Sequence, residues 1–263
     1  MKKKPFSSLT SRDKTWLLTD VKTDLSRQLS GESRRRFLKM GLTIGGIAML
    51  TGCDISDDSH VDYALSRMSR FNDRVQGFLF NGTRLAQVYT ESQITRPFPF
   101  NAFYGREDIP VIESDIYRLE LAGKIRDKRP WTLEQLGSLQ QVSQITRHVC
   151  VEGWSAIGRW DGVPFSLFLN AVGADLNAKY VSFKCVDDYY TSIDMETALH
   201  PQTLLALGYD GSTLPPEYGY PIKLRVPTKL GYKNPKHIRV IEVTDNFPGG
   251  YWEDQGYNWF GGS

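Results

Sequence analysis

The segment Arg147–Ser155, which reads RHVCVEGWS, combines the residue types best suited to chemistry in this chain. It contains Cys150, whose thiolate form would be a strong nucleophile and a good ligand for a soft metal. A nearby positive charge would favour the thiolate, and Arg147, a bound metal or both could supply it. Taken alone, the segment is also compatible with a buried, inert cysteine at the end of a strand.

A hydrolase or acyl transferase is a second way to use the same segment. Cys150 or Ser155 would be the nucleophile, and a histidine would be the base. The histidines available for this role are His148, His200 and His237. Gly153-Trp154-Ser155 lacks the second glycine of a nucleophile elbow, which weakens this hypothesis. A disulfide between Cys150 and Cys185 remains open if the protein is exported.

The elements that must position these residues are mostly strands. Val142–Val149 is strand-like and leads directly into Cys150. Further strands are expected at Ile116–Ala122, Tyr180–Val186, Ile222–Val226 and Ile238–Val243. Helices are expected at Trp131–Leu139 with Thr132 as its cap, at Pro164–Val172 and at Ala198–Ala206. This order predicts an α+β domain in which strands dominate, with no βαβ rhythm.

Composition excludes several classes of function. The chain has 263 residues, a formal net charge of +2 and basic residues spread along its length, so nothing points to nucleic acid. Its three cysteines form no CxxC pair, which excludes a zinc ribbon, an iron–sulfur cluster and covalent haem. The chain also lacks a GxGxxG motif and a Walker loop, which argues against a nicotinamide or ATP enzyme.

Residues 1–53 are predicted to be an export signal. Ser33–Lys39 carries paired arginines and precedes the apolar run Met40–Thr51, which is the twin-arginine pattern. That run falls short of the about 20 residues that a bilayer span needs. Leu50–Cys53 resembles a lipobox, so we expect Cys53 to be lipidated and the protein to sit at the periplasmic face of the inner membrane. The alternatives are a buried amphipathic helix, or a signal cleaved nearby with Cys53 incidental.

The rest of the chain is predicted to contain a linker and one catalytic domain. Residues 54–92 read as a linker of mixed charge with a short helix around Val61–Phe71. Residues 93–263 read as one oxidoreductase domain. Cargo of the twin-arginine route is folded before export and is rich in enzymes that are loaded with cofactor, so the signal favours a redox protein.

Several separate blocks between residues 95 and 263 resemble the sulfite oxidase fold. Within it they are most similar to the branch of the periplasmic methionine-sulfoxide reductase catalytic subunit. The central block is Cys150–Ser155, followed by Trp160, Gly162 and Pro164. Phe100–Tyr104 resembles a pterin-holding block. The first downstream block is Leu214–Pro216 with Gly219, Pro221, Lys223 and Pro227. It is followed by the lysines Lys229, Lys233 and Lys236. The last block, Gly250–Tyr257, is similar to the family's closing strand and loop.

The resemblance implies a molybdenum–molybdopterin cofactor, with Cys150 bound to the metal and two-electron oxygen-atom transfer as the reaction. The implied catalytic residues are Cys150, Arg147, Glu152 and Trp154. The residues implied to bind the cofactor are Asn101, Tyr104, Gly105, Cys150, Cys185, Tyr218, Lys223, Lys229, Lys233, Asn234, Pro235 and Lys236. The resemblance further implies a membrane-bound electron-transfer subunit, linked to haem or quinone, because this chain has no haem or flavin motif.

Departures from the family pattern bear on the substrate. Lys223, Tyr218 and Cys185 replace residue types that the reductase branch uses, so the contacts of these positions are in doubt. Sulfite oxidases have a loop rich in Asn and Arg after the cysteine, whereas Val151–Trp154 stands here, and Leu207 replaces their active-site tyrosine. An S-oxide or N-oxide, such as a methionine-sulfoxide-like group, is therefore favoured over sulfite. The alternatives are a sulfite-oxidising enzyme, a lipid-anchored binding module without metal, and the hydrolase described above.

Overall fold

The computed structural model describes residues 59–79 and 84–262, and the residues from Tyr63 onward belong to one compact unit. The predicted export signal and Cys53 lie outside the described residues. Among the helices that are described, none is long and apolar enough to cross a membrane.

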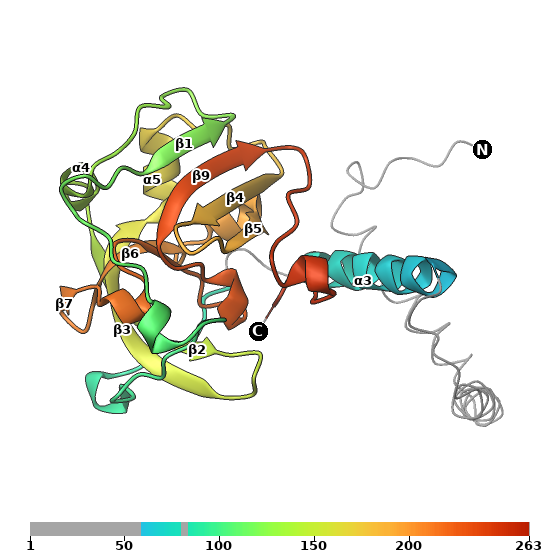
Figure 1. The fold of residues 1–263 in the computed structure, drawn as a ribbon, viewed down its shortest axis with the longest axis horizontal. Helices are drawn as coiled ribbons and strands as arrows, with labels where there is room; N and C mark the ends of the chain where they lie inside the picture. Colours follow the sequence, from blue (N-terminus) through green and yellow to red (C-terminus); the bar gives the residue numbers. More distant parts are fainter. Residues whose placement is uncertain (1–58, 80–83, 263) are drawn as a thin grey trace, which may run out of the picture. The chain divides into compact units, whose positions relative to one another are not determined.

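Two sheets, the first mixed and the second antiparallel throughout, form the centre of the domain (Figure 1). The first has the order β1–β9–β4–β5, with bounds Glu120–Gly123, Ile238–Thr244, Tyr180–Cys185 and Tyr190–Asp194. Strand β1 runs parallel to β9, whereas β4 is antiparallel to both β9 and β5. The carboxyl end of β4 and the start of β5 are neighbours at one end of this sheet, where a hairpin joins them.

The second sheet carries the segment with Cys150. Its order is β2–β3–β6–β7, and β8 pairs with β6. The bounds are Val142–Val149, Ser155–Pro164, Leu204–Tyr209, Ser212–Thr213 and Lys223–Arg225. Strands β2 and β3 pair in an antiparallel hairpin from Val142↔Gly162 to Val149↔Ser155. Residues 150–154 are therefore the hairpin loop, held between two long strands.

The helices of the described residues are short, apart from α3. The α-helices are α3 (Ser59–Leu79), α4 (Leu133–Gly137), α5 (Phe165–Ala171) and α6 (Met195–Leu199). The 3-10 helices are η3 (Glu91–Gln93), η4 (Arg106–Asp108), η5 (Pro216–Tyr218), η6 (Gly231–Lys233) and η7 (Glu253–Gln255). Helix α4 begins with a capping box, in which Thr132 Oγ1 accepts from Gln135 N and Gln135 Oε1 accepts from Thr132 N.

One large apolar core lies between the sheets and the helices, and a smaller aromatic core lies on the second sheet. The large core includes Leu119, Phe165, Phe183, Leu224 and Ile241, all fully buried. The small core contains Phe98, Ala156, Trp160, Ala206, Tyr209 and Leu214. Since β8 contributes to the large core, its polar residues Lys223 and Arg225 are buried with it.

The sequence predicted the class of the fold and most of its elements. The α+β class, with mixed sheets and short helices, is confirmed, as are the strands at β2, β4, β8 and β9 and the helices at α4 and α5. Strand β1 is shorter than predicted, and α3 extends beyond the short helix expected at residues 61–71. Strands β3, β5 and β6 were not predicted.

Two element predictions are wrong. A helix over 198–206 does not form, because α6 ends at Leu199 and β6 begins at Leu204. Pro201 disfavours a helical conformation at His200, which has φ −59° and ψ 136°. The closing strand expected within residues 250–257 is also absent, since the 3-10 helix η7 occupies that segment.

Candidate cofactor site

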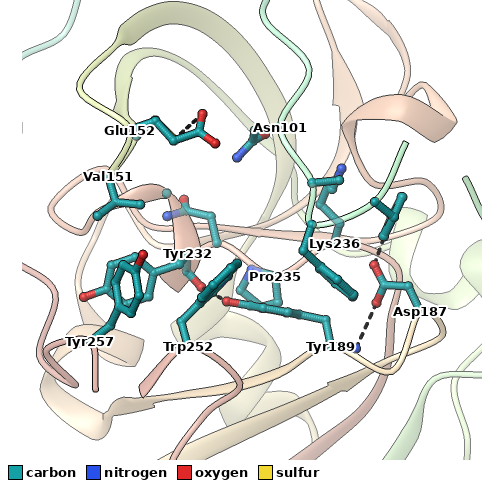
Figure 2. Close-up of a pocket in the computed structure, with 16 residues that line it drawn as sticks. Asn101, Val151, Glu152, Asp187, Tyr189, Tyr232, Pro235, Lys236, Trp252 and Tyr257 are labelled. Carbon is teal, nitrogen blue, oxygen red and sulfur yellow. Dashed lines mark hydrogen bonds between the residues drawn. The ribbon is translucent and has the colours of Figure 1, made fainter. Parts of the chain in front are cut away.

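A cavity opens where the β2–β3 loop meets the β4–β5 hairpin and the segment after η6 (Figure 2). Its lining comes from five separate parts of the chain. The lining residues are Asn101, Ala102, Phe103, Tyr104, Cys150, Val151, Glu152, Asp187, Tyr189, Gly231, Tyr232, Asn234, Pro235, Lys236, Trp252 and Tyr257.

Cys150 is placed in this cavity by the end of β2. Its backbone N–H donates to Trp154 O at 2.9 Å, and its carbonyl accepts from Gly153 N at 3.2 Å, which closes a tight turn. Gly153 adopts φ +93°, a conformation that favours glycine. The side chain of Cys150 is 8% exposed, and its thiol donates to Glu152 Oε2 at 3.6 Å. The thiol is thus buried at the wall of a cavity that opens to solvent.

The electrostatics around Cys150 differ from the sequence-based expectation. Burial raises the pKa of its thiol, and the Glu152 carboxylate raises it further. Arg147, a bound metal or both were expected to favour the thiolate, and the side chain of Arg147 is exposed and does not line the cavity. The physical reason is the alternation of β2, which buries Thr146 and His148 and turns Arg147 to the opposite face. A bound cation, rather than Arg147, would have to displace the thiol proton.

Aromatic side chains make the outer wall of the cavity. In Figure 2, Tyr189, Trp252 and Tyr257 lie across the cavity from Asn101 and Glu152. The aromatic rings support one another: Tyr189 and Trp252 each contact Tyr251, with ring centroids 5.7 Å and 5.3 Å apart. This wall offers apolar surface with a few polar edges, which suits an organic ligand.

Tyr104 and Lys236 are two polar residues of the cavity lining. Tyr104 donates its hydroxyl to Asp187 Oδ2 at 3.0 Å, and burial raises the pKa of Tyr104. The Nζ of Lys236 lies 4.7 Å from the centre of the Phe100 ring and donates to Glu217 O at 3.2 Å. Lys236 therefore presents a cation at the cavity wall, with its ammonium group over an aromatic ring.

Next to the cavity lies a set of buried basic residues that we term the basic cluster. It comprises His148 from β2, Lys223 and Arg225 from β8, and Lys236 and His237 from the segment before β9. All five side chains are buried. Gly231, on the cavity wall, packs directly on His148, since a Cβ there would lie 2.8 Å from His148 Nε2. Lys236 thus lines the cavity directly, and His148 lies behind the backbone of Gly231.

The positive charge of the basic cluster is poorly compensated. Burial, followed by the neighbouring cations, lowers the pKa of both His148 and Lys223 well below the ordinary value. Burial lowers the pKa of Lys236 to about 8 and that of Arg225 to about 9. Carboxylates act on Lys236, through Asp187 and Glu217, but they do not offset the burial.

Several nitrogen atoms of the basic cluster have no hydrogen-bond partner among the described residues. They are both ring nitrogens of His148, Nε of Arg225 and Nε2 of His237. The nearby Nε1 of Trp160 also has no hydrogen-bond partner among the described residues. Buried polar atoms are rarely left in this condition. Unpaired donors and uncompensated cations beside a cavity fit an anionic ligand that is rich in acceptor atoms. A pterin cofactor with a phosphate tail has these properties.

Lys229 and Lys233 are not part of this arrangement. Lys233 donates to Ser192 O at 2.9 Å and forms a buried ion pair with Glu253. Lys229 Nζ lies 3.7 Å from Asp194 Oδ2 and 2.9 Å from the centre of the Phe260 ring. Both lysines therefore point toward carboxylates of the protein and away from the cavity lining. The resemblance implied that the three lysines surround the cofactor phosphate, and for Lys229 and Lys233 this assignment stays a prediction.

The remaining predicted residues lie around the cavity rather than in its lining. Cys185 is a buried free thiol at the end of β4, and Cys150 is also free, so the structure contains no disulfide between them. Tyr218 belongs to the aromatic core and donates to Phe98 O at 2.9 Å. Gly105 caps η4, next to Tyr104. Trp154 donates to Glu152 Oε2 at 2.8 Å and so positions that carboxylate.

Sequence reasoning missed a large part of the lining. Asp187, Tyr189, Gly231 and Tyr232 were missed altogether, and five further lining residues lie in blocks that the resemblance covered but were given no role there: Ala102, Phe103, Val151, Trp252 and Tyr257. The hairpin after β4 could have indicated Asp187, since an acidic turn follows a strand there. The period of β2 could have placed His148 and Cys150 on one face. No local signal in the sequence shows that Tyr232 and Tyr257 meet.

Comparisons with known proteins agree with the chemistry of this site. The family described as "Oxidoreductase molybdopterin binding domain" matches residues 106–252. The chain is 61% identical over 247 residues to the "Putative protein-methionine-sulfoxide reductase subunit YedZ1" of Azospira oryzae, covering 94% of each chain. It is 32% identical over 180 residues to the "Protein-methionine-sulfoxide reductase catalytic subunit MsrP" of Gluconobacter oxydans, covering 58% of this chain and 57% of that protein.

Other matches are more distant. The chain is 30% identical over 161 residues to the MsrP protein of Burkholderia mallei, covering 55% of this chain and 49% of that protein. It therefore spans about half the length of these MsrP relatives. Among solved structures, the sulfane dehydrogenase SoxCD of Paracoccus pantotrophus aligns with a TM-score of 0.49 and 22% identity, over 52% of this chain and 40% of that one.

Proposed function

The chain belongs to the oxidoreductase molybdopterin binding domain family, and from this premise we propose that it is an exported enzyme that reduces an S-oxide by oxygen-atom transfer. The substrate class that we propose is methionine sulfoxide in proteins. The names of two relatives, a "Putative protein-methionine-sulfoxide reductase subunit" and a "Protein-methionine-sulfoxide reductase catalytic subunit", support this class. The observation that carries the proposal is the buried thiol of Cys150 at the wall of a cavity backed by uncompensated basic residues.

The residues that would hold a molybdenum–molybdopterin cofactor come from the cavity and the basic cluster. Cys150 Sγ would bind the metal, and Asn101, Tyr104 and Asn234 would contact the pterin. Lys236 with the rest of the basic cluster would neutralise its anionic parts. When bound, the cofactor supplies two-electron redox chemistry and a site that takes oxygen from the substrate.

The protein's own residues would bind the substrate and manage protons. The aromatic wall formed by Tyr189, Trp252 and Tyr257 offers apolar surface to a thioether-like side chain and excludes water from it. Reduction of an S-oxide to a thioether and water consumes two electrons and two protons. The Glu152 carboxylate accepts a hydrogen bond from the Cys150 thiol, with Oε2 3.6 Å from Sγ, and a second one from Trp154. We assign Glu152 the role of holding a proton at the cavity mouth.

Export, anchoring and the electron source are parts of the same proposal. The twin-arginine pattern and the lipobox at Cys53 support a lipid-anchored protein at the periplasmic face of the inner membrane. Among the described residues, no group of His, Cys, Asp and Glu could hold a further metal centre. Electrons would come from a membrane-bound subunit linked to haem or quinone. The test of anchoring is the fractionation of Cys53→Ala, which should release the protein from membranes.

Elemental analysis tests the central claim. Protein produced in a host that makes molybdopterin should contain roughly one molybdenum per chain. Cys150→Ser should lose the metal and the reduction of an oxidised, methionine-rich protein by a viologen donor. Cys185→Ser is the matched control, because it removes a buried thiol that does not line the cavity, and it should keep both. Wild-type protein without molybdenum, or full metal content in Cys150→Ser, would refute the assignment.

A further inference from the structure

Helix α3 carries a stripe of exposed apolar side chains that the fold leaves uncovered. Met68, Phe71, Val75 and Phe78 are 63%, 62%, 39% and 75% exposed. Their spacing of three and four residues places all of them on one face of the helix. Single exposed apolar residues, such as Val111, are ordinary on a protein surface, but a continuous stripe on one helix face marks an interaction site.

The opposite face of α3 packs on the protein itself. Asp73 Oδ1 accepts from Asn258 Nδ2 at 2.7 Å and from Phe260 N at 3.0 Å. Gly77 lies one turn further along, where an added Cβ would be 3.7 Å from the Phe260 ring. The C-terminal segment thus fixes which face of α3 is turned inward. The apolar stripe lies about half a turn away and is turned outward.

Exposed basic residues flank the apolar stripe. Arg67, Arg70 and Arg74 follow the same helical spacing and are all exposed. The one acidic residue between positions 67 and 78 is Asp73, whose carboxylate is engaged by the C-terminal segment. The outer face of α3 therefore combines large apolar side chains with positive charge. This combination is the pattern of a helix that lies in the interface of an anionic bilayer.

We propose that α3 lies along the surface of an anionic membrane, with Met68, Phe71, Val75 and Phe78 in the lipid and the arginines at the headgroups. This inference takes the proposed lipid anchor at Cys53 as a premise. Ser59, where α3 begins, is six residues after Cys53 in the sequence. Six residues reach at most about 22 Å, so an anchored Cys53 keeps the helix at the membrane. The helix then gives the domain a fixed face toward the bilayer, which a lipid anchor alone would not provide.

A site-specific environmental label tests this proposal in the processed, full-length protein. Phe78→Cys, on the stripe, and Val111→Cys, which replaces a residue that is 96% exposed, are each labelled with a polarity-sensitive fluorophore. Cys150 and Cys185 are buried, and a lipidated Cys53 would not react. The proteins are reconstituted in vesicles of phosphatidylethanolamine and phosphatidylglycerol that contain a nitroxide lipid. A label at position 78 should shift to the blue and be quenched, whereas a label at position 111 should do neither.

The outcomes separate this inference from the proposed anchor. If the protein is bound to vesicles but the label at position 78 stays aqueous, the inference is overturned and the anchor stands. A second label found at Cys53 by mass spectrometry refutes the anchor, while quenching at position 78 would still support the helix. A blue shift at position 78 before lipid is added would show that the stripe is covered by a second copy or by another part of the chain, and would overturn the inference. Equal quenching in phosphatidylcholine vesicles would refute the role of the arginines.

Discussion

Replacing Lys233 distinguishes a structural ion pair from a cofactor ligand. The side chains of Lys233 and Glu253 are 1% and 3% exposed, and they pair with each other. Lys233→Met keeps the length of the side chain but leaves the Glu253 carboxylate buried with Thr191 Oγ1, at 2.8 Å, as a remaining donor. Removing one partner of a buried pair costs about 3–5 kcal/mol. At about 2–4 °C per kcal/mol for a unit of this size, the melting temperature should fall by about 6–20 °C.

The assay is thermal unfolding of the cofactor-free protein, followed by circular dichroism. The double variant Lys233→Met/Glu253→Gln should recover most of the lost stability, because the uncompensated carboxylate is then gone. Lys184→Met, which removes an exposed lysine, is the control and should change little. If Lys233→Met leaves the melting temperature unchanged and instead lowers the content of cofactor, then Lys233 binds the cofactor phosphate and our interpretation of this lysine is wrong.

Three further predictions concern the basic cluster and the sheet. Lys236→Met should weaken cofactor binding roughly tenfold or more, measured as molybdenum retained on dialysis, because a cation at the cavity wall is lost. Burial lowers the pKa of Lys236 from 10.5 to about 8, so the unfolded state binds more protons above pH 7. The stability of cofactor-free wild type relative to Lys236→Met should therefore rise by about 1 kcal/mol from pH 7 to pH 9, and a fall would contradict the pKa shift. Gly123→Ala should destabilise the protein by at least about 1–3 kcal/mol in urea unfolding. The reason is that Gly123 has φ +72° and that an added Cβ would lie 2.1 Å from Val243 O. Gly137→Ala is the control and should not destabilise the protein, because an added Cβ there meets no atom within 4 Å.

The part of the site that the sequence predicted depends on local pattern. Val142–Val149 has the composition of a strand, and the glycine and tryptophan after Cys150 indicate a loop, so the cysteine was correctly expected at a strand end. The capping box at Thr132 was likewise visible, since its partners are three residues apart. Elements of this kind are specified by neighbours in the chain, and a single sequence contains that information.

The part that the sequence did not predict depends on contacts between distant segments. Lys229, Lys233 and Lys236 look equivalent in the sequence, but Asp194 and Glu253 pair with the first two. Those carboxylates are 35 and 20 positions away in the sequence. The strand β6 was missed because Leu204–Tyr209 is uniformly apolar, and a short apolar run does not distinguish a buried strand from a helix. In both cases tertiary structure decides what local pattern leaves open.

The basic cluster joins the stability of the domain to its cofactor. His148, Lys223 and Arg225 are fixed by strands that also build the cores, so they cannot turn out to solvent without disrupting the sheet. In the cofactor-free protein their desolvation opposes folding, as the lowered pKa values of His148, Lys223 and Arg225 indicate. An anionic ligand would relieve that penalty and would pair the unsatisfied nitrogens, so its binding energy would also be folding energy. A protein built in this way is most stable after it is loaded, which accords with a chain whose predicted export route carries folded cargo.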